Sequence, residues 1–306
     1  MSWFSALYAS GMRHSRWGRS WSWRREALLV LAAIAVLPFG CSTSASAPTG
    51  ERAANEPGKV VWHDLTTEDP AACKKFYSAL LGWEYVDTTV LGRPYSVARL
   101  GQRPVGGIHA PQPDKAGKTP AHWLSYISVA DVDASVEKAK AQGGGVLAGP
   151  VDVDSHGRAA VLRDPQGAPF GLIHLSAGDP VDPPSPIQGT FFWNEYLTKD
   201  LDATLAFYNG LVPFEMTVSK SEAGASYVVL KHGRAKAGVF RLPDDKNVPP
   251  NWLPYVFVSD PAGLASRVAG LGGRVILAPA SEIRNGSLAV VADPTGAVVA
   301  LQKYPY

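Results

Sequence analysis

The chain contains a long internal repeat, and this repeat constrains its fold more than any other feature. Residues 62–84 read WHDLTTEDPAACKKFYSALLGWE, and residues 193–215 read WNEYLTKDLDATLAFYNGLVPFE. The first tryptophan, the Phe-Tyr pair and the final glutamate of the two copies match at a constant offset of 131 residues. A repeat of this kind predicts that one supersecondary unit occurs at least twice in the chain.

Each copy predicts a strand, a capped helix and a second strand. Asp69 can accept the free amide hydrogens of a first helical turn, and Pro70 stands where a missing N–H does no harm. Ala72, Phe76 and Leu80 follow at intervals of four residues, which predicts one helical stripe facing a core. The repeat therefore begins with a β-strand followed by an amphipathic helix.

The rest of each half continues in the same alternating pattern. Turn residues at Gly101 and at Asp164-Pro165-Gln166-Gly167 separate runs rich in β-branched and aromatic residues. Asp131 or Asp133 caps a second helix, and Gly143 ends it. The expected order is βαβββ twice in each half, with strands at 83–89, 93–101, 103–111, 123–129, 145–155, 157–164 and 168–176.

This arrangement resembles the vicinal oxygen chelate superfamily, which includes glyoxalase I, extradiol dioxygenases and bleomycin-resistance proteins. The resemblance rests on FYSALLGW and FYNGLVPF at the helix ends and on DPQG and DPTG before the last strands, and it covers roughly residues 58–304. It implies an α+β fold of two tandem glyoxalase-like domains. Each domain would be a pair of βαβββ modules that forms a curved sheet around a cleft.

The expected domain boundaries follow the composition of the chain. Residues 42–57 and 177–188 are rich in Pro, Ser, Ala, Thr or Gly, which is typical of a tether and a linker. The predicted divisions are a signal segment at 1–41, a flexible tether at 42–57, domain 1 at 58–176, a Pro-rich linker at 177–188 and domain 2 at 189–306.

The N-terminal segment predicts export. Five arginines precede an apolar run at 27–40, which is shorter than the roughly 20 residues that span a bilayer. Gly40-Cys41, followed by small residues, resembles a bacterial lipoprotein signal in which Cys41 is lipidated. An ordinary cleaved signal and an uncleaved anchor are the alternatives. We expect an exported protein, anchored in a bacterial membrane through Cys41 or periplasmic, whose only membrane contact is this anchor.

Charge and cysteine content exclude other classes. The formal net charge is +2, but the five N-terminal arginines and one glutamate contribute +4, which leaves −2 for the remainder. A nearly neutral body gives no reason to expect a nucleic-acid partner. Cys73 is the one cysteine after Cys41, so the domains cannot contain an internal disulfide, and we expect it to be a small buried hydrophobe.

The resemblance implies a divalent metal held by His, Gln or Glu, but the six confidently matched positions hold other residues, namely Trp62, Leu124 and Gly171 in domain 1 and Trp193, Leu253 and Ala300 in domain 2. None of these six side chains can coordinate a metal. We therefore predict no cofactor. The alternative is zinc or iron held by His109, His122 and Asp64. The family's metal ligand on the fourth strand would fall near His109 in domain 1 and near Phe240 and Arg241 in domain 2.

Two carboxylates are candidates for chemistry. Asp64 and Glu195 have the strand parity of Trp62 and Trp193, so we expect them to point into the clefts. Each could be a general base with a raised pKa, or a polar anchor that holds an Arg or a Tyr. Aromatic side chains could line the two clefts or belong to the core, and the candidates are Trp62, Trp123, Tyr126, Trp193, Trp252 and Tyr255.

Three functions remain open from the sequence. The favoured one is binding of a small aromatic or amphipathic molecule in a metal-free cleft, as bleomycin-resistance proteins do. The second is a metal-dependent lyase, isomerase or dioxygenase that acts through domain 1. Of the seven histidines, domain 1 holds five, whereas domain 2 holds only His232 and His14 lies in the signal segment. The third is an interaction-only protein whose clefts are filled by their own side chains.

Overall fold

The computed structural model describes residues 54–112, 119–220, 226–242 and 248–304. Cys41, the signal segment and tether residues 42–53 lie outside these described residues, so their predicted roles stay predictions. Among the described helices, none has the length and apolar character needed to cross a membrane.

The first half of the chain forms one eight-stranded sheet from two βαβββ modules. Strand order is β2-β3-β4-β1-β5-β8-β7-β6, so β1 and β5 pair antiparallel at the centre. The elements are β1 (Val60–Thr66), α2 (Pro70–Leu81), β2 (Glu84–Val90), β3 (Arg93–Leu100), β4 (Arg103–His109), β5 (His122–Ser128), α3 (Val132–Ala141), β6 (Gly145–Val153), β7 (Gly157–Arg163) and β8 (Pro169–Leu175).

The second half repeats this topology with the order β10-β11-β12-β9-β13-β16-β15-β14. The predicted α+β fold of two tandem domains, each a pair of βαβββ modules, is therefore confirmed. The elements are β9 (Phe191–Thr198), α4 (Leu201–Leu211), β10 (Glu215–Lys220), β11 (Ser226–His232), β12 (Arg234–Arg241), β13 (Asn251–Phe257), α5 (Pro261–Val268), η2 (Ala269–Leu271), β14 (Arg274–Leu277), η3 (Arg284–Gly286), β15 (Leu288–Ala292) and β16 (Val298–Gln302).

The helix starts follow the sequence signals. Asp69 accepts a hydrogen bond from the amide of Ala72 at 2.9 Å, with Pro70 in the first helical position. Asp131, not Asp133, caps α3, which begins at Val132. On α2 the predicted stripe is buried at Phe76 and Leu80, whereas Ala72 is half-buried and Cys73 and Tyr77 complete the packed side.

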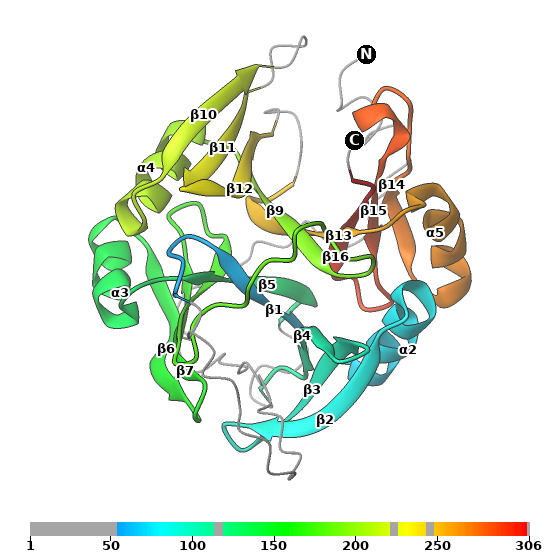
Figure 1. Ribbon diagram of the computed structural model, residues 1–306, viewed down its shortest axis with the longest axis horizontal. Coiled ribbons are helices and arrows are strands. Elements are labelled where there is room, and N and C mark those ends of the chain that lie inside the picture. Colours follow the sequence, from blue (N-terminus) through cyan, green and yellow to red (C-terminus); the bar gives the residue numbers. More distant parts are fainter. Residues whose placement is uncertain (1–53, 113–118, 221–225, 243–247, 305–306) are drawn as a thin grey trace.

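Each sheet curls so that one face points inward and the other packs against helices (Figure 1). We call the face that carries Trp62 or Trp193 the inner face. In domain 1 its core joins Trp62 and Leu124 to side chains from β2, β3, β6, β7 and β8. The opposite, outer faces carry the helices and face the other domain.

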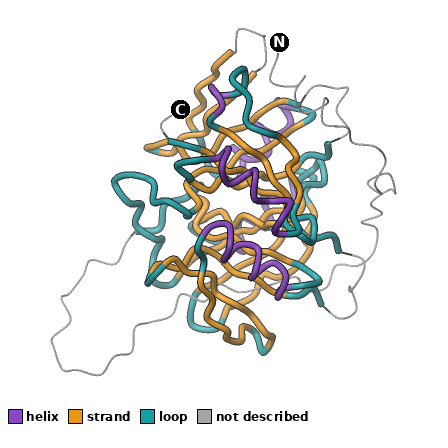
Figure 2. The backbone as a smooth tube through the Cα atoms, turned by 90° about the vertical axis from the view of Figure 1, so that its right-hand side faces the viewer, coloured by secondary structure: helices purple, strands orange, loops and turns teal. Residues whose placement is uncertain are grey.

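The two domains share their outer cores. Figure 1 shows α3 beside α4 on one side and α2 beside α5 on the other, and Figure 2 shows helices lying across the strands behind them. One apolar cluster joins Phe170 of domain 1 to Phe207 of domain 2, and the other joins Phe76 of domain 1 to Val299 of domain 2. Because each outer face is covered by the other domain, the pairing takes place within one chain.

Reciprocal hydrogen bonds cross this interface. The Tyr77 hydroxyl donates to Asp293 Oδ2 at 3.2 Å, and the Tyr208 hydroxyl donates to Asp164 Oδ2 at 3.1 Å. These residues belong to the FYSALLGW, FYNGLVPF, DPTG and DPQG motifs, so the motifs of one domain bind those of the other. Cys73 lies in the same contact, fully buried as predicted, with Sγ 3.5 Å from Asp293 Oδ2.

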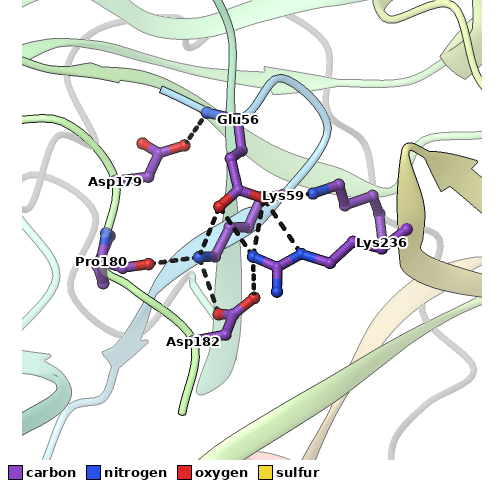
Figure 3. A network of polar contacts seen from close by, with 7 residues as sticks. Glu56, Lys59, Asp179, Pro180, Asp182 and Lys236 are labelled. Carbon is purple, nitrogen blue, oxygen red and sulfur yellow. Dashed lines mark hydrogen bonds and ion pairs between the residues drawn. The ribbon is translucent and has the colours of Figure 1, made fainter. Parts of the chain in front are cut away.

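An ionic network fixes the chain just before β1 (Figure 3). Glu56 forms ion pairs with Arg234 at 2.8 Å and Lys236 at 2.7 Å, both on β12 of domain 2. Asp182 of the linker pairs with Lys59 at 2.8 Å and with Arg234 at 2.7 Å. Burial alone would raise the pKa of Glu56, but the bonds from Lys236 and Arg234 lower it to about 2. The segment before domain 1, the linker and domain 2 are thus tied together.

Candidate functional site

The centre of the domain 1 inner face is a buried carboxyl group. Strand pairing sets Trp62 opposite Tyr126 and Asp64 opposite Leu124, so these four side chains share one face. Asp64 Oδ1 accepts hydrogen bonds from Trp62 Nε1 at 2.9 Å and from the Tyr95 hydroxyl at 2.5 Å. The prediction that Asp64 points inward beside Trp62 agrees with this placement.

The environment of Asp64 favours its neutral form. Burial raises the pKa of Asp64 to about 7, although the hydrogen bonds from Tyr95, Trp62 and Tyr126 oppose the rise. Asp64 can therefore gain or lose a proton near neutral pH.

Two glycines make room for the tyrosines around this carboxyl. A Cβ added at Gly107 would lie 1.7 Å from the Tyr95 hydroxyl oxygen and 2.3 Å from Asp64 Oδ1. A Cβ at Gly171 would lie 2.2 Å from the Tyr126 ring. The glycines are thus needed because the tyrosine side chains lie directly over the backbone of β4 and β8.

Domain 2 repeats this cluster with a glutamate at its centre. Glu195 Oε1 accepts from the Tyr227 hydroxyl at 2.9 Å, and Oε2 accepts from the Tyr255 hydroxyl at 2.5 Å. Trp193 Nε1 donates to the Tyr227 hydroxyl at 3.2 Å. Gly238 again underlies a tyrosine, since a Cβ there would lie 2.1 Å from the Tyr227 hydroxyl.

The two clusters differ in one charged residue. Arg284 donates to Glu195 Oε1 through Nη2 and to Gln302 Oε1 through Nη1, the latter at 2.5 Å. The side chain of Glu195 is fully buried and that of Arg284 is 15% exposed. Domain 2 therefore has the anchor that holds an Arg and a Tyr, which was one of the two predicted roles for these carboxylates.

The two candidate metal-binding histidines lie farther along the same inner face. His109 and His122 both pair with Thr66, and Thr66 Oγ1 lies 3.1 Å from His109 Nε2. Burial lowers the pKa of His109 to about 4 and also lowers the pKa of His122. In domain 2, Leu197 pairs in the same way with Phe240 and Asn251. The residue equivalent to His109 on the fourth strand is therefore Phe240 and not Arg241.

Two of the predicted cleft aromatics belong elsewhere. Trp123 and Trp252 have the opposite strand parity to Tyr126 and Tyr255, so they face the interface between the domains. Trp123 Nε1 donates to the Tyr77 hydroxyl at 2.9 Å, in the outer core. The prediction that Trp123 and Trp252 line the clefts is wrong because alternation along a strand separates them from the inner set.

The residues present do not fit a metal at the positions that the fold family uses. Trp62, Leu124 and Gly171 lie together on the inner face but offer no ligand atom, and the Tyr126 ring occupies the space above Gly171. In the described part of the chain, no group of three or more His, Cys, Asp or Glu side chains is arranged to hold a metal ion. His109, His122 and Asp64 do not form such a group.

Sequence reasoning missed three members of these clusters. Tyr95 and Tyr227 correspond to each other in the repeat, and this correspondence of two polar aromatics was the signal that could have identified them. Arg284 had no such signal, because it lies in a short turn before β15 and has no charged counterpart in domain 1.

Each domain has an aromatic inner face with a buried carboxyl group at its centre. Together with the four βαβββ modules and the reciprocal contacts between the domains, this arrangement defines a tandem glyoxalase-type fold. The family model of the Glyoxalase/Bleomycin resistance protein/Dioxygenase superfamily matches residues 59–172. With the relatives described next, this match shows that the chain belongs to that superfamily.

Several relatives match nearly the full length of the two domains. The protein named "Putative glyoxylase CFP32" of Mycobacterium tuberculosis is 39% identical over 253 residues, which is 80% of this chain and 95% of that protein. The anthracycline biosynthesis protein DauV of Streptomyces sp. strain C5 is 30% identical over 260 residues, or 79% of this chain and 91% of the relative.

Solved structures share the fold at low sequence identity. The Mn(II)-bound glyoxalase from Novosphingobium aromaticivorans has a TM-score of 0.55 and 13% identity, covering 81% of this chain and 82% of that one. Homoprotocatechuate 2,3-dioxygenase from Brevibacterium fuscum has a TM-score of 0.54 and 15% identity, covering 85% and 84%. These likenesses show the fold alone.

Proposed function

We propose that the protein binds a small aromatic molecule with hydrogen-bonding groups at the inner face of domain 1, without a metal. The observation that carries this proposal is the buried Asp64 carboxyl, which is enclosed by Trp62, Tyr95 and Tyr126 and whose pKa burial raises to about 7. Aromatic walls with a few fixed polar groups are typical of small-molecule sites.

Domain 2 supports binding less well. Glu195 is already neutralised by Arg284, and both of its carboxylate oxygens accept hydrogen bonds. A ligand there would have to displace a buried ion pair, which is energetically costly. Domain 1 is therefore the binding half in this proposal, and domain 2 stabilises it through the shared outer cores.

The relatives are consistent with an aromatic ligand. DauV and the 30% identical DnrV of Streptomyces peucetius are both named as anthracycline biosynthesis proteins. Such a name supports a role in handling an aromatic small molecule, either by binding it or by moving a proton on it through Asp64. Proton transfer at Asp64 suits a carboxyl group whose pKa is about 7.

The binding proposal is tested with tryptophan fluorescence and metal analysis on one preparation purified without chelator. 1-Naphthol should quench the fluorescence of the protein and of a Trp193→Phe control, and it should bind the Tyr95→Phe variant more weakly. Mass spectrometry should find no stoichiometric divalent metal. One equivalent of zinc, iron or manganese that is lost with His122→Ala would instead support the metal-dependent lyase, isomerase or dioxygenase. Neither metal nor quenching would leave the interaction-only function.

Export and lipidation form a separate part of the proposal. The arginine-rich start, the apolar run at 27–40 and Cys41 support an exported lipoprotein or a periplasmic protein. Metabolic labelling with palmitate in a bacterial host should mark the protein, and Cys41→Ser should abolish the label. A labelled Cys41→Ser protein, or an unlabelled parent found in the cytoplasm, would overturn lipidation or export respectively.

A further inference from the structure

Strand β10 of domain 2 is exposed along one edge and on both of its faces. It is the first strand of its sheet and pairs with β11 on one side, and no described strand pairs with its other side (Figure 1). Every residue from Glu215 to Val218 is exposed, although successive side chains point to opposite faces of the sheet. An open edge of this kind presents unpaired backbone N–H and C=O groups to another chain.

The outer face of β10 is apolar. Met216 is 38% exposed and Val218 is 60% exposed, which makes them two of the four exposed large apolar side chains among the described residues. Strand pairing sets Met216 opposite Leu230, which belongs to an outer core shared with domain 1. Val218 lies opposite Val228 of the same core. The apolar surface of this core therefore continues past β11 and reaches solvent at the edge of the sheet.

Domain 1 protects the equivalent edge strand, β2, with polar groups. At the constant offset of 131 residues, Met216 corresponds to Tyr85 and Val218 corresponds to Asp87. Lys74 of α2 forms an ion pair with Asp87, and its Nζ lies 5.7 Å from the centre of the Tyr85 ring. Charged side chains on an edge strand are a common protection against pairing with another chain.

Domain 2 lacks these polar groups. Leu205 of α4 stands where domain 1 has Lys74. Val228 of β11 stands where domain 1 has Ser96, which donates to Asp87 at 2.6 Å. Four positions that hold Lys, Tyr, Asp and Ser in domain 1 thus hold Leu, Met, Val and Val in domain 2. Because the same fold accepts a polar edge in domain 1, the apolar edge of domain 2 indicates a surface that another molecule covers.

The exposed residues of β10 are complementary to a second copy of the same strand. In an antiparallel pair, residues that lie opposite each other share one face of the sheet. A two-fold axis through Thr217 meets this condition, because it sets Met216 opposite the partner's Val218 and Val218 opposite the partner's Met216. The two apolar side chains of each strand would then cover those of the other, and Glu215 would not face its own copy.

We propose that β10 is the contact strand of a two-fold dimer, in which it pairs antiparallel with β10 of a second copy of this chain. The backbone groups of the open edge gain partners in this dimer, and Met216 and Val218 leave solvent. The domain 2 sheets of the two chains form one continuous sheet across the axis. The inner face of domain 1 takes no part in the contact, so this inference goes beyond the proposed function.

The mass of the full chain in solution tests this contact, and Cys41→Ser is used throughout to exclude a lipid anchor. Sedimentation velocity at about 100 μM, where a contact with a micromolar dissociation constant is formed, should give twice the mass of one chain. Val218→Lys puts a charge on the paired strand and should give the mass of one chain. Thr89→Lys puts the same charge on the outer face of β2, the equivalent edge of domain 1, and should leave the dimer intact.

Added cysteines test the register of the two strands. Thr217→Cys brings two thiols opposite each other at the axis, with the Cα atoms about 4.5–5.5 Å apart, a separation that a disulfide can span. Mild oxidation should therefore link two chains. Glu215→Cys is the control, because its two copies lie roughly 13 Å apart along the strands and cannot be linked. Cys73 is fully buried and should not react.

Several outcomes would overturn the dimer. These are a single-chain mass at the stated concentration, a dimer that survives Val218→Lys, and linkage through Glu215→Cys instead of Thr217→Cys. A single chain that sediments with phosphatidylglycerol vesicles, and no longer does so after Val218→Lys, would assign the apolar edge to a membrane surface. None of these results bears on ligand binding at domain 1, so the proposed function stands or fails separately.

Discussion

His63 and Asn194 occupy equivalent positions in the two domains, 131 residues apart, and hydrogen-bond to each other through His63 Nε2 and Asn194 Oδ1 at 2.8 Å. The bond lies where the central strands of the two sheets meet, and the His63 ring stacks on Phe191 at 4.0 Å. Burial lowers the pKa of His63 to about 4. The contact between the domains therefore depends on a neutral histidine.

The histidine gives the fold a sensitivity to acid that His63→Gln should remove. Between pH 6.5 and 4 the unfolded chain binds a proton at His63 that the folded chain does not, so this contribution to stability is lost as the pH falls. The loss is roughly 3 kcal/mol across the window. Urea unfolding at pH 7, 5 and 4 should show the parent losing stability relative to His63→Gln. A difference that is constant with pH would contradict the role of His63.

Asp64 should have the opposite pH dependence. Its pKa in the folded chain is about 7 against an ordinary value of 3.8, so the folded chain holds a proton that the unfolded chain releases. This contribution is present at low pH and is lost as the pH rises from about 4 through 7. Asp64→Asn should therefore gain on the parent by roughly 2–4 kcal/mol over that range, measured by urea unfolding. A stability difference between Asp64→Asn and the parent that stays constant over this range would contradict the raised pKa.

The reciprocal tyrosines should differ in their contribution to stability. Tyr208→Phe leaves Asp164 Oδ2 with the Tyr196 hydroxyl as a donor, whereas Tyr77→Phe leaves Asp293 Oδ2, among the described residues, with only the Cys73 thiol. Both variants also remove an acceptor for a tryptophan N–H, so that loss is shared. We expect Tyr77→Phe to cost about 1–3 kcal/mol and Tyr208→Phe about 1 kcal/mol in unfolding experiments. Equal costs would show that the spare donor has no effect.

The buried ion pair of domain 2 should cost more to break than to replace. Arg284→Met leaves Glu195 buried and uncompensated, which typically costs about 3–5 kcal/mol. Adding Glu195→Gln removes the isolated charge, so the double variant should be more stable than Arg284→Met alone. A double-mutant cycle of unfolding free energies measures the difference, and additive effects would indicate that the pair is not coupled.

Cys73 should be chemically inert in the folded protein. Burial, followed by the nearby charge of Asp293, raises the pKa of the thiol to about 12, so almost no thiolate exists at neutral pH. In a Cys41→Ser variant, a disulfide reagent should label no thiol under native conditions and one thiol in concentrated urea. Labelling without urea would mean that the domain interface opens.

The fold could be predicted because its signals are local and repeated. Asp69 and Pro70 start α2 as predicted, and the strand parity of Trp62 and Asp64 predicted correctly that both point inward. Trp123 was misplaced because it has the opposite strand parity to Tyr126 and therefore faces the other domain. Arg284 could not be predicted, since its contact with Glu195 joins residues that are 89 apart through a turn of unusual backbone conformation.

The crossed contacts of Tyr77 with Asp293 and Tyr208 with Asp164 are those of a symmetric dimer. A half-length ancestor carrying one tyrosine and one aspartate of this kind would have made both contacts with a second copy of itself. Joining the copies through a Pro-rich segment released them from sharing one sequence, because each half could then change alone. Because the halves lie in one chain, one can hold Arg284 where the other has Ser155, a difference that no homodimer can encode.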